Sequence, residues 1–309
     1  MSRVTRNERF CIFALSNFKI KTDNMKKIFV MTIALFGLVC LFSKCDKIEG
    51  PYYEILTNED VNVTFPDLDP STVYRKMLIE EFTGHRCTNC PQGHQTLENL
   101  HQQYGDTLIA VGVHFGSLAK PLGETFSYDF RTEVGNAIGA EYAIDAIPKA
   151  IVDQVFKEGG WSRDQWATVL KEVDRSTVYA AIQLINEFGN SNKTLKVNAK
   201  VTMLEDNPNP VMLAFYLVED GIVKPQKDGN QDILDYVHNH VLRASLNGVY
   251  GASLNGGNLI PKGGSDVYAA SIDMSETDWV PENCYVVAIL SDQSSKKVLQ
   301  VEKLDVISR

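Results

Sequence analysis

The chain has 309 residues, six cysteines and a formal net charge of −9, from 30 Lys and Arg against 39 Asp and Glu. This acidic balance argues against binding to nucleic acids or to anionic lipid headgroups, because both carry negative charge. The length suits two domains better than one, and the few cysteines are not those of a small domain stapled by several disulfides.

The first 44 residues carry targeting signals rather than the pattern of a folded core. Residues 25–27 are Met-Lys-Lys, and the uncharged apolar run 28–42 has the length of a signal-peptide core, which is short for crossing a bilayer. We therefore predict a non-native extension over residues 1–24, from a misassigned start codon, and a lipoprotein signal peptide over residues 25–44. The alternative is an uncleaved anchor with a cytoplasmic tail.

Cys45 follows this run at the place where bacterial lipoproteins carry the cysteine that becomes the lipidated N-terminus. Lys44 stands where such signals usually have a small residue. We predict lipidation at Cys45 and membrane attachment through this N-terminal lipid anchor, with an ordinary signal peptide as the alternative. Residues 45–71 are rich in Asp, Asn, Pro and Glu, which predicts a flexible tether.

Residues 72–175 alternate between strand and helix patterns. Apolar strands are expected at 77–82, 107–115 and 146–156, the last broken at Pro148, and helices at 91–104, 127–140 and 161–173. For the last helix, Ser162 and Gln165 have the spacing of a capping box. This order predicts an α/β layer arrangement.

Residues 178–309 have a different pattern, with seven alternating apolar runs and no convincing helix. The runs begin near Ala180, Leu195, Met212, Val237, Val267, Val286 and Val298. Turn-forming clusters rich in Asn, Gly and Pro separate them, which is typical of a β-sandwich. We place the domain boundary between the two patterns, at 175–178.

Cys87 and Cys90 are separated by two residues at the junction between the first expected strand and the first expected helix. Thiols at this spacing can form a disulfide across one helical turn, and the first sulfur then lies at the positive end of the helix. A redox-competent pair and a purely structural disulfide are both compatible with the spacing.

The segment 78–91 resembles the active-site segment of the thioredoxin superfamily. Glu81, six residues before Cys87, falls where that superfamily keeps a buried carboxylate, and Ile147-Pro148 is similar to its cis-proline loop. The resemblance implies that Cys87 attacks, Cys90 resolves the mixed disulfide and Glu81 relays a proton. Pro148 would leave backbone free to pair with a substrate strand. The alternatives are an exposed Glu81 and an ordinary trans turn at Pro148.

Two positions depart from the superfamily pattern. His85-Arg86 replaces the usual aromatic residue before the first cysteine, although the cation should still favour a thiolate. The inner dipeptide Thr88-Asn89 is not one of the well-characterised reductases or oxidases, so the sequence leaves the redox direction open.

Zinc is the main rival for the cysteine pair. His85, Cys87, Cys90 and His94 offer four ligands, but helical geometry should aim His94 away from Cys87. Covalent haem attachment needs a histidine after the second cysteine, where Pro91 stands. We therefore predict no metal and no cofactor.

Two further features lie in the second half. His238 and His240 alternate along an expected strand, where a two-histidine site is conceivable and a solvated strand face is favoured. Cys284 begins an apolar run and is expected to be a buried free thiol in a strand.

Taken as a whole, residues 45–309 resemble the Omp28-related outer-membrane lipoproteins. The residues that carry this resemblance are 45–51, the segment 80–84 leading into Cys-x-Asn-Cys-Pro, and 238–244. It implies a thioredoxin-like domain at 72–175 followed by an immunoglobulin-like sandwich at 178–309, displayed at the cell envelope. We predict thiol–disulfide exchange with protein partners; the alternative is a non-catalytic surface binding or adhesion lipoprotein with a structural disulfide.

Overall fold

The computed structural model describes residues 55–57 and 61–307, and this part of the chain is mostly β with few helices. The α-helices are α2 (Cys90–Tyr104), α3 (Glu133–Glu141) and α4 (Trp166–Glu172). Short 3₁₀ turns are η1 (Pro70–Thr72), η2 (Gly105–Thr107), η3 (Ser117–Ala119), η4 (Arg163–Gln165), η5 (Asn255–Gly257) and η6 (Pro281–Asn283). The strands are β1 (Ile55–Thr57), β2 (Met77–Thr83), β3 (Leu108–His114), β4 (Lys149–Val152), β5 (Trp161–Ser162), β6 (Ala180–Gly189), β7 (Thr194–Met203), β8 (Val211–Glu219), β9 (Ile222–Val223), β10 (Gln226–Asp228), β11 (Gln231–Ile233), β12 (Val237–His238), β13 (Val241–Ser245), β14 (Ala252–Ser253), β15 (Ser265–Asp273), β16 (Cys284–Asp292) and β17 (Val298–Asp305).

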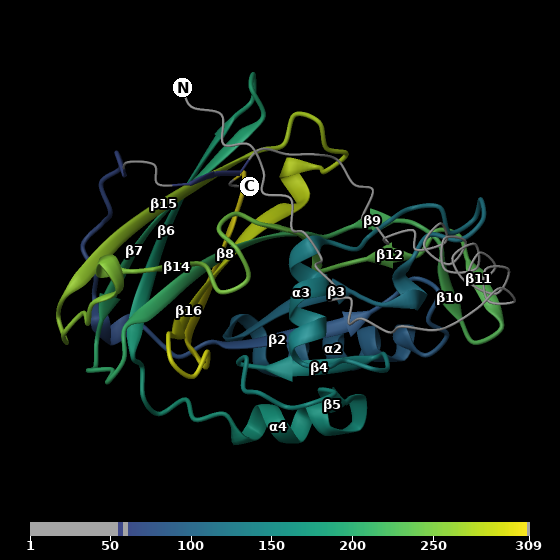
Figure 1. The fold of residues 1–309 in the computed structure, drawn as a ribbon, viewed down its shortest axis with the longest axis horizontal. Helices are drawn as coiled ribbons and strands as arrows, with labels where there is room; N and C mark the ends of the chain where they lie inside the picture. The colour runs from purple at the N-terminus through teal and green to yellow at the C-terminus, as the bar shows by residue number, and fades with distance from the viewer. Residues whose placement is uncertain (1–54, 58–60, 308–309) are drawn as a thin grey trace, which may run out of the picture. The chain divides into compact units, whose positions relative to one another are not determined.

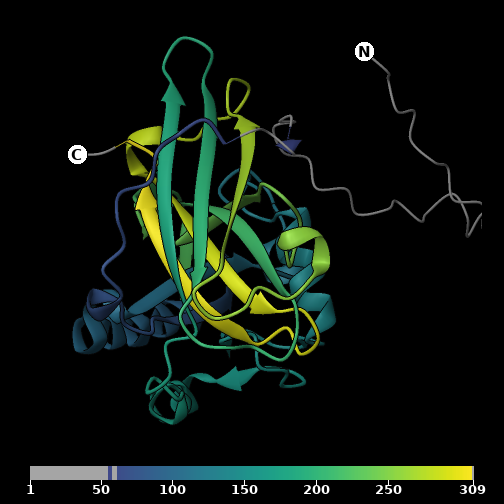
Figure 2. The same ribbon diagram turned by 90° about the vertical axis from the view of Figure 1, so that its left-hand side faces the viewer.

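One nine-stranded sheet contains strands from both halves of the sequence. Its order is β17-β16-β8-β13-β3-β2-β4-β5, with β14 paired to β8. β2 and β3 are parallel and every residue in them is buried, as expected of near-continuous apolar strands. β13 joins β3 through a single parallel pair, Val241 with Gly112. A second sheet has the order β1-β15-β7-β6, and Figure 2 shows its long strands in front of β16 and β17.

Three apolar clusters hold these layers together. Helices α2 and α4 cover one face of β2, β3 and β4, and α3 covers the other face (Figure 1). On that second face, β8 and β16 of the same sheet add side chains to the cluster under α3. The third cluster lies between the four-stranded sheet and the opposite face of β8 and β16. Because side chains alternate across a strand, consecutive residues of β2 serve different clusters: Ile79 faces α2 and α4, whereas Leu78 and Phe82 face the α3 side.

Several predicted elements are confirmed. The strands at 77–82 and 107–115 are β2 and β3, and the helix at 91–104 is α2. Gly105 adopts φ 55° and ends α2, in keeping with glycine's freedom in the left-handed region. Each of the seven apolar runs after residue 178 contains or adjoins a strand, while the shorter β9, β10, β11 and β14 lie in segments without such alternation.

The helix predicted at 127–140 begins later, at Glu133. Asp129 accepts hydrogen bonds from the backbone N–H and the guanidinium of Arg131, so local side-chain bonds compete with helix formation before Thr132. Thr132 then caps α3, with its Oγ1 accepting from the N–H of Gly135 at 2.9 Å.

Two other predicted elements have different bounds. The capping box of Ser162 and Gln165 is present, but residues 161–162 pair with β4 as β5, and the helix follows as η4 and α4. The strand predicted at 146–156 is shorter, because β4 starts only after Pro148 and ends at Val152.

The expected domain boundary at 175–178 falls in the connection between α4 and β6. Strands on both sides of it share the nine-stranded sheet, and the described residues belong to one compact unit. The division into domains at 72–175 and 178–309 stays a prediction.

The predicted extension 1–24, the signal peptide 25–44 and Cys45 lie outside the described residues. Within the predicted tether 45–71, residues 55–57 pair with β15 as β1. In the part of the chain that the structure describes, no helix has the length and apolar character needed to cross a membrane.

Candidate functional site

Cys87 and Cys90 form a disulfide at the start of α2, with their Cα atoms 5.4 Å apart. Cys87 lies in a tight turn, where its N–H donates to the carbonyl of Gly84 at 2.9 Å, and Cys90 is the first residue of the helix. Pro91 follows at a position where a missing N–H costs no helical hydrogen bond. The turn thus places the first sulfur at the positive end of the helix, with Cys87 2 % exposed and Cys90 fully buried.

Pro148 lies beside this disulfide. The Ile147–Pro148 peptide bond is cis, and the carbonyl oxygen of Ile147 is 3.7 Å from the sulfur of Cys87. A Cβ built on Gly93, one helical turn after Cys90, would lie 3.0 Å from the Cβ of Pro148. The structure therefore brings the proline loop and the cysteine pair together.

Glu81 lies against the same turn of α2. Its Oε1 would be 2.6 Å from a Cβ on Gly93, and the side chain is buried without a hydrogen-bond partner for that oxygen. Removal from water disfavours the charged carboxylate and raises the pKa of Glu81 to about 8. At neutral pH the group is therefore a carboxylic acid, which can donate a proton.

Glu80 is also buried, but its side chain lies on the opposite face of β2. It accepts from Nε2 of Gln154 at 3.4 Å, and burial raises its pKa to about 7. The alternative that Glu81 is an exposed residue beside Glu80 is wrong, because neither carboxyl reaches the surface. Of the two, Glu81 faces the helix that carries the disulfide.

Arg86, next to the first cysteine, bonds to the η3 segment. Its guanidinium donates to the carbonyls of Ser117 and Lys120, and its N–H donates to the carbonyl of Leu118. Arg86 therefore holds the η3 segment against the cysteine turn.

A hairpin from the second half of the chain, β10–β11, covers the cysteine turn. Gln226 is fully buried, and its Nε2 donates to the carbonyls of Gly84 at 3.3 Å and Cys87 at 3.0 Å. The backbone N–H groups of Lys227 and Gly229 donate to the carbonyls of His85 and Thr88 at 2.8 and 3.0 Å. We refer to residues 226–233 as the covering hairpin. The sequence predictions do not include this hairpin, whose turn signal is the two-residue loop Gly229-Asn230 between paired Asp228 and Gln231.

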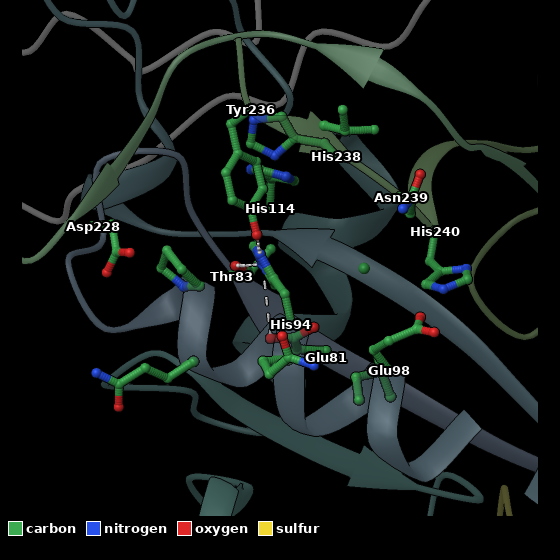
Figure 3. Close-up of a pocket in the computed structure, with 16 residues that line it drawn as sticks. Glu81, Thr83, His94, Glu98, His114, Asp228, Tyr236, His238, Asn239 and His240 are labelled. Carbon is green, nitrogen blue, oxygen red and sulfur yellow. Dashed lines mark hydrogen bonds and ion pairs between the residues drawn. The ribbon is translucent and has the colours of Figure 1, made fainter. Parts of the chain in front are cut away.

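A cavity of about 590 Å³ lies between α2 and the segment around β12 (Figure 3). Its titratable lining side chains are Glu81, His94, Glu98, His114, Asp228, Tyr236, His238 and His240. His94 bridges the two sides: its Nε2 is hydrogen-bonded to Oγ1 of Thr83 at 2.8 Å and its Nδ1 to the hydroxyl of Tyr236 at 2.6 Å (Figure 3). The same Nε2 is 3.9 Å from Oε1 of Glu81.

The solvated strand face predicted for His238 and His240 is wrong for His238, which is 2 % exposed. His240 has φ 59° and lies between the end of β12 and the start of β13, so the two histidines do not alternate along one strand. His238 packs instead against Phe130 and His114, and burial lowers its pKa to about 4. The buried imidazoles are therefore neutral.

The four proposed zinc ligands are not arranged around a common point. His85 stacks on Phe126, with ring centroids 5.6 Å apart, while His94 is bonded to Thr83 and Tyr236. Among the described residues, no group of three or more His, Cys, Asp or Glu side chains is placed to hold a metal ion.

Cys284 is a free thiol at the start of β16, and it is buried as predicted. Burial raises its pKa above the ordinary value for a thiol. It therefore supplies a natural internal control for the reactivity of the other two cysteines.

Comparison with known proteins gives a family and a fold. A family model described as "Outer membrane protein Omp28" matches residues 135–308. The solved structure of HBP35 of Porphyromonas gingivalis is similar with a TM-score of 0.59 and 16 % identity, over 76 % of each chain. A domain of the outer membrane lipoprotein Omp28 from Porphyromonas gingivalis is 24 % identical over 43 % of this chain and 93 % of that one, with a TM-score of 0.29. No curated protein matches the chain significantly.

Proposed function

The chain belongs to the Omp28 family of outer membrane proteins, and we propose that its Cys87–Cys90 pair exchanges disulfides with protein partners in the cell envelope. Membership of this family makes it an outer-membrane protein. Attachment through a lipid on Cys45 is part of the proposal, and it fits the apolar run that ends three residues earlier.

The observation that carries this proposal is the meeting of three groups at one helix start. A disulfide lies at the start of α2, the carbonyl before a cis proline lies 3.7 Å from its first sulfur, and the protonated Glu81 of β2 packs against Gly93, one turn further along α2. A carboxyl group with a pKa near 8 can give and take a proton at neutral pH, as general acid–base chemistry on a thiol requires.

The proposed reaction is an exchange of one disulfide for another. A thiolate of the partner attacks the sulfur of Cys87, a new intermolecular disulfide forms, and the bonding pair of the old one leaves on Cys90. Cys90 takes the proton of Glu81 and becomes a thiol. In the second half, a second thiolate of the partner attacks the partner's sulfur in the mixed disulfide, so that the partner's own disulfide forms and Cys87 leaves with the bonding pair and takes a proton. Run in reverse, with Cys87 attacking a partner disulfide and Cys90 then resolving the mixed disulfide, the same steps reduce the partner. The partner is oxidised when Cys87 and Cys90 end as thiols.

The fold supports a thioredoxin-like assignment for residues 72–175. Parallel β2 and β3, the helix α2 directly after β2, and antiparallel β4 directly after Pro148 follow the arrangement that the resemblance implies. We propose further that residues 178–309 form an immunoglobulin-like sandwich that orients or recruits the partner. The two facing sheets and their shared apolar cluster support this part.

One observation favours a second candidate, a non-catalytic binding or adhesion lipoprotein with a structural disulfide. Cys87 is 2 % exposed beneath the covering hairpin, so no partner thiol reaches its sulfur while the hairpin stays closed. The two candidates differ in whether this cover opens.

Insulin reduction and thiol alkylation together test the proposal. We expect the reduced protein to catalyse insulin reduction, Cys87→Ser to abolish it, and Cys284→Ser to leave it unchanged. At pH 7, iodoacetamide should label reduced Cys87 faster than the buried Cys284. Equal activity in wild type and Cys87→Ser, or no activity in either, would exclude exchange and favour the structural disulfide.

A further inference from the structure

Beyond the cysteines, the exchange reaction needs a route by which Glu81 recovers its proton. Once Glu81 has given its proton to Cys90, it is a carboxylate without water around it, and such a buried charge is costly. Its Oε1 has no hydrogen-bond partner, so no fixed donor already stabilises that charge. Turnover therefore depends on a nearby group that can pass a proton inward.

We propose that His94, held by Tyr236, carries protons between the cavity and Glu81, and so acts as a positioning residue for the exchange at Cys87 and Cys90. The inference rests on the proposed exchange function. Among the described residues, Nε2 of His94 is the imidazole nitrogen paired with Oε1 of Glu81, at 3.9 Å. A shift of about 1 Å would bring the two atoms within hydrogen-bonding distance.

The ring of His94 is fixed from both sides. Thr83, two residues after Glu81 on the same face of β2, is bonded to Nε2 at 2.8 Å, and the Tyr236 hydroxyl is bonded to Nδ1 at 2.6 Å. Gly93, beside His94 in α2, leaves room for Glu81, because a Cβ there would come within 2.6 Å of Oε1. The side chain of His94 is 22 % exposed and that of Glu81 only 2 %, so the ring joins the nearly buried carboxyl to the open part of the cavity that both line.

The chemistry suits a neutral imidazole, which donates from one nitrogen and accepts at the other. Burial, with the nearby His238 and His240, lowers the pKa of His94 to about 3, so the ring is uncharged at neutral pH. The titratable groups facing it are Glu81 of β2, Glu98 of α2, His114 of β3, Asp228 of β10, Tyr236, His238 of β12 and His240.

Each proton that one group of the relay gives up is replaced by the next group. Cys90 takes the proton of Glu81 when the disulfide opens, and the Glu81 carboxylate takes the Nε2 proton of His94. His94 takes the hydroxyl proton of Tyr236 at Nδ1 and becomes the other neutral tautomer, while Tyr236 regains a proton from solvent in the cavity. The net result is transfer of one solvent proton to Cys90, with no oxidant beyond the disulfide itself.

The test measures reduction of the Cys87–Cys90 disulfide in the full chain by dithiothreitol, from pH 6 to 9, with and without added imidazole. General acid–base groups typically contribute about 10²–10⁴-fold, so losing this link in the relay should slow His94→Gln by at least about 10-fold and alter its pH profile. Imidazole, which can enter the cavity, should restore part of the rate. His240→Asn is the matched control, since His240 lines the same cavity but bonds to Tyr285 and not to Glu81.

The outcomes separate this inference from the function on which it rests. If wild type does not exchange with insulin, the proposed function fails. If wild type exchanges but His94→Gln keeps its rate and pH profile, or loses rate without rescue by imidazole, the relay is overturned and the function stands. Should His94→Gln not fold, Tyr236→Phe decides, because it removes only the hydroxyl; an unchanged rate and pH profile there would also overturn the relay.

Discussion

The buried Glu81 carboxyl should make the stability of this protein depend on pH in a way that a single substitution removes. Burial raises the pKa of Glu81 from the ordinary value of 4.5 to about 8 in the folded chain. In the unfolded chain the group is in water and titrates near 4.5. Glu81→Gln keeps the shape of the side chain and cannot ionise.

Whether stability rises or falls with pH follows from the number of protons that the folded and unfolded states bind. A raised carboxyl pKa means that between pH 4.5 and 8 the folded state holds a proton that the unfolded state has lost, so stability falls as pH rises through this window. Each unit of pKa difference corresponds to about 1.4 kcal/mol, so wild type loses roughly 5 kcal/mol between pH 4 and 9 from this group. Relative to wild type, the Glu81→Gln variant should therefore become more stable by about that amount between pH 4 and 9.

Urea unfolding of the oxidised protein, followed by tryptophan fluorescence at several pH values, measures this difference. Glu124→Gln is the control, because the side chain of Glu124 is exposed to solvent in the folded chain. We expect the difference in free energy of unfolding between Glu81→Gln and wild type to increase steadily up to about pH 8 and then level off. A gap that stays constant with pH would refute the assignment of Glu81 as a buried acid, and with it the proton relay.

Three further predictions concern the supports of the site. Arg75 and Asp153 pair at 2.7 Å with both side chains under 4 % exposed, so Asp153→Asn should cost about 3–5 kcal/mol in urea unfolding; a loss below about 1 kcal/mol would contradict this. Gly93→Ala places a Cβ 2.6 Å from Oε1 of Glu81, and should destabilise by about 1–3 kcal/mol where alanine normally favours a helix; higher thermal stability would contradict the close contact. Gln226→Ala removes two hydrogen bonds to the cysteine turn, worth about 1–3 kcal/mol, so alkylation of the first cysteine should accelerate severalfold; unchanged labelling would mean that the hairpin is not what covers the sulfur.

Local patterns in the sequence predicted the elements that build the cysteine site. Periodicity and end signals were sufficient for β2, β3 and α2, because the apolar spacing and the stop at Gly105 act within a few residues. The positions of Glu81 and Pro148 came from a resemblance, and the structure brings both to the start of α2.

The cavity could not be predicted in this way, because its contacts join residues far apart in the chain. His94 and Tyr236 are 142 positions apart, and Gln226 is 139 positions from Cys87. The strands that present the covering hairpin are three residues long, too short for a periodic pattern. The prediction for His238 fails for a related reason: it requires a regular strand through His240, whose left-handed backbone separates β12 from β13.

The covering hairpin and Tyr236 belong to one short stretch of chain, residues 226–240, between β9 and β13. In the nine-stranded sheet, the strands before residue 175 meet the strands after residue 178 where β13 pairs with β3. The stretch 226–240 leads directly into β13. The segment that bonds to the cysteine turn through Gln226 therefore also holds the ring of His94 through Tyr236, three residues beyond the end of β11. If exchange occurs at Cys87 as proposed, this one segment of the second half bounds both the approach of a partner to the disulfide and the path of the proton to Glu81.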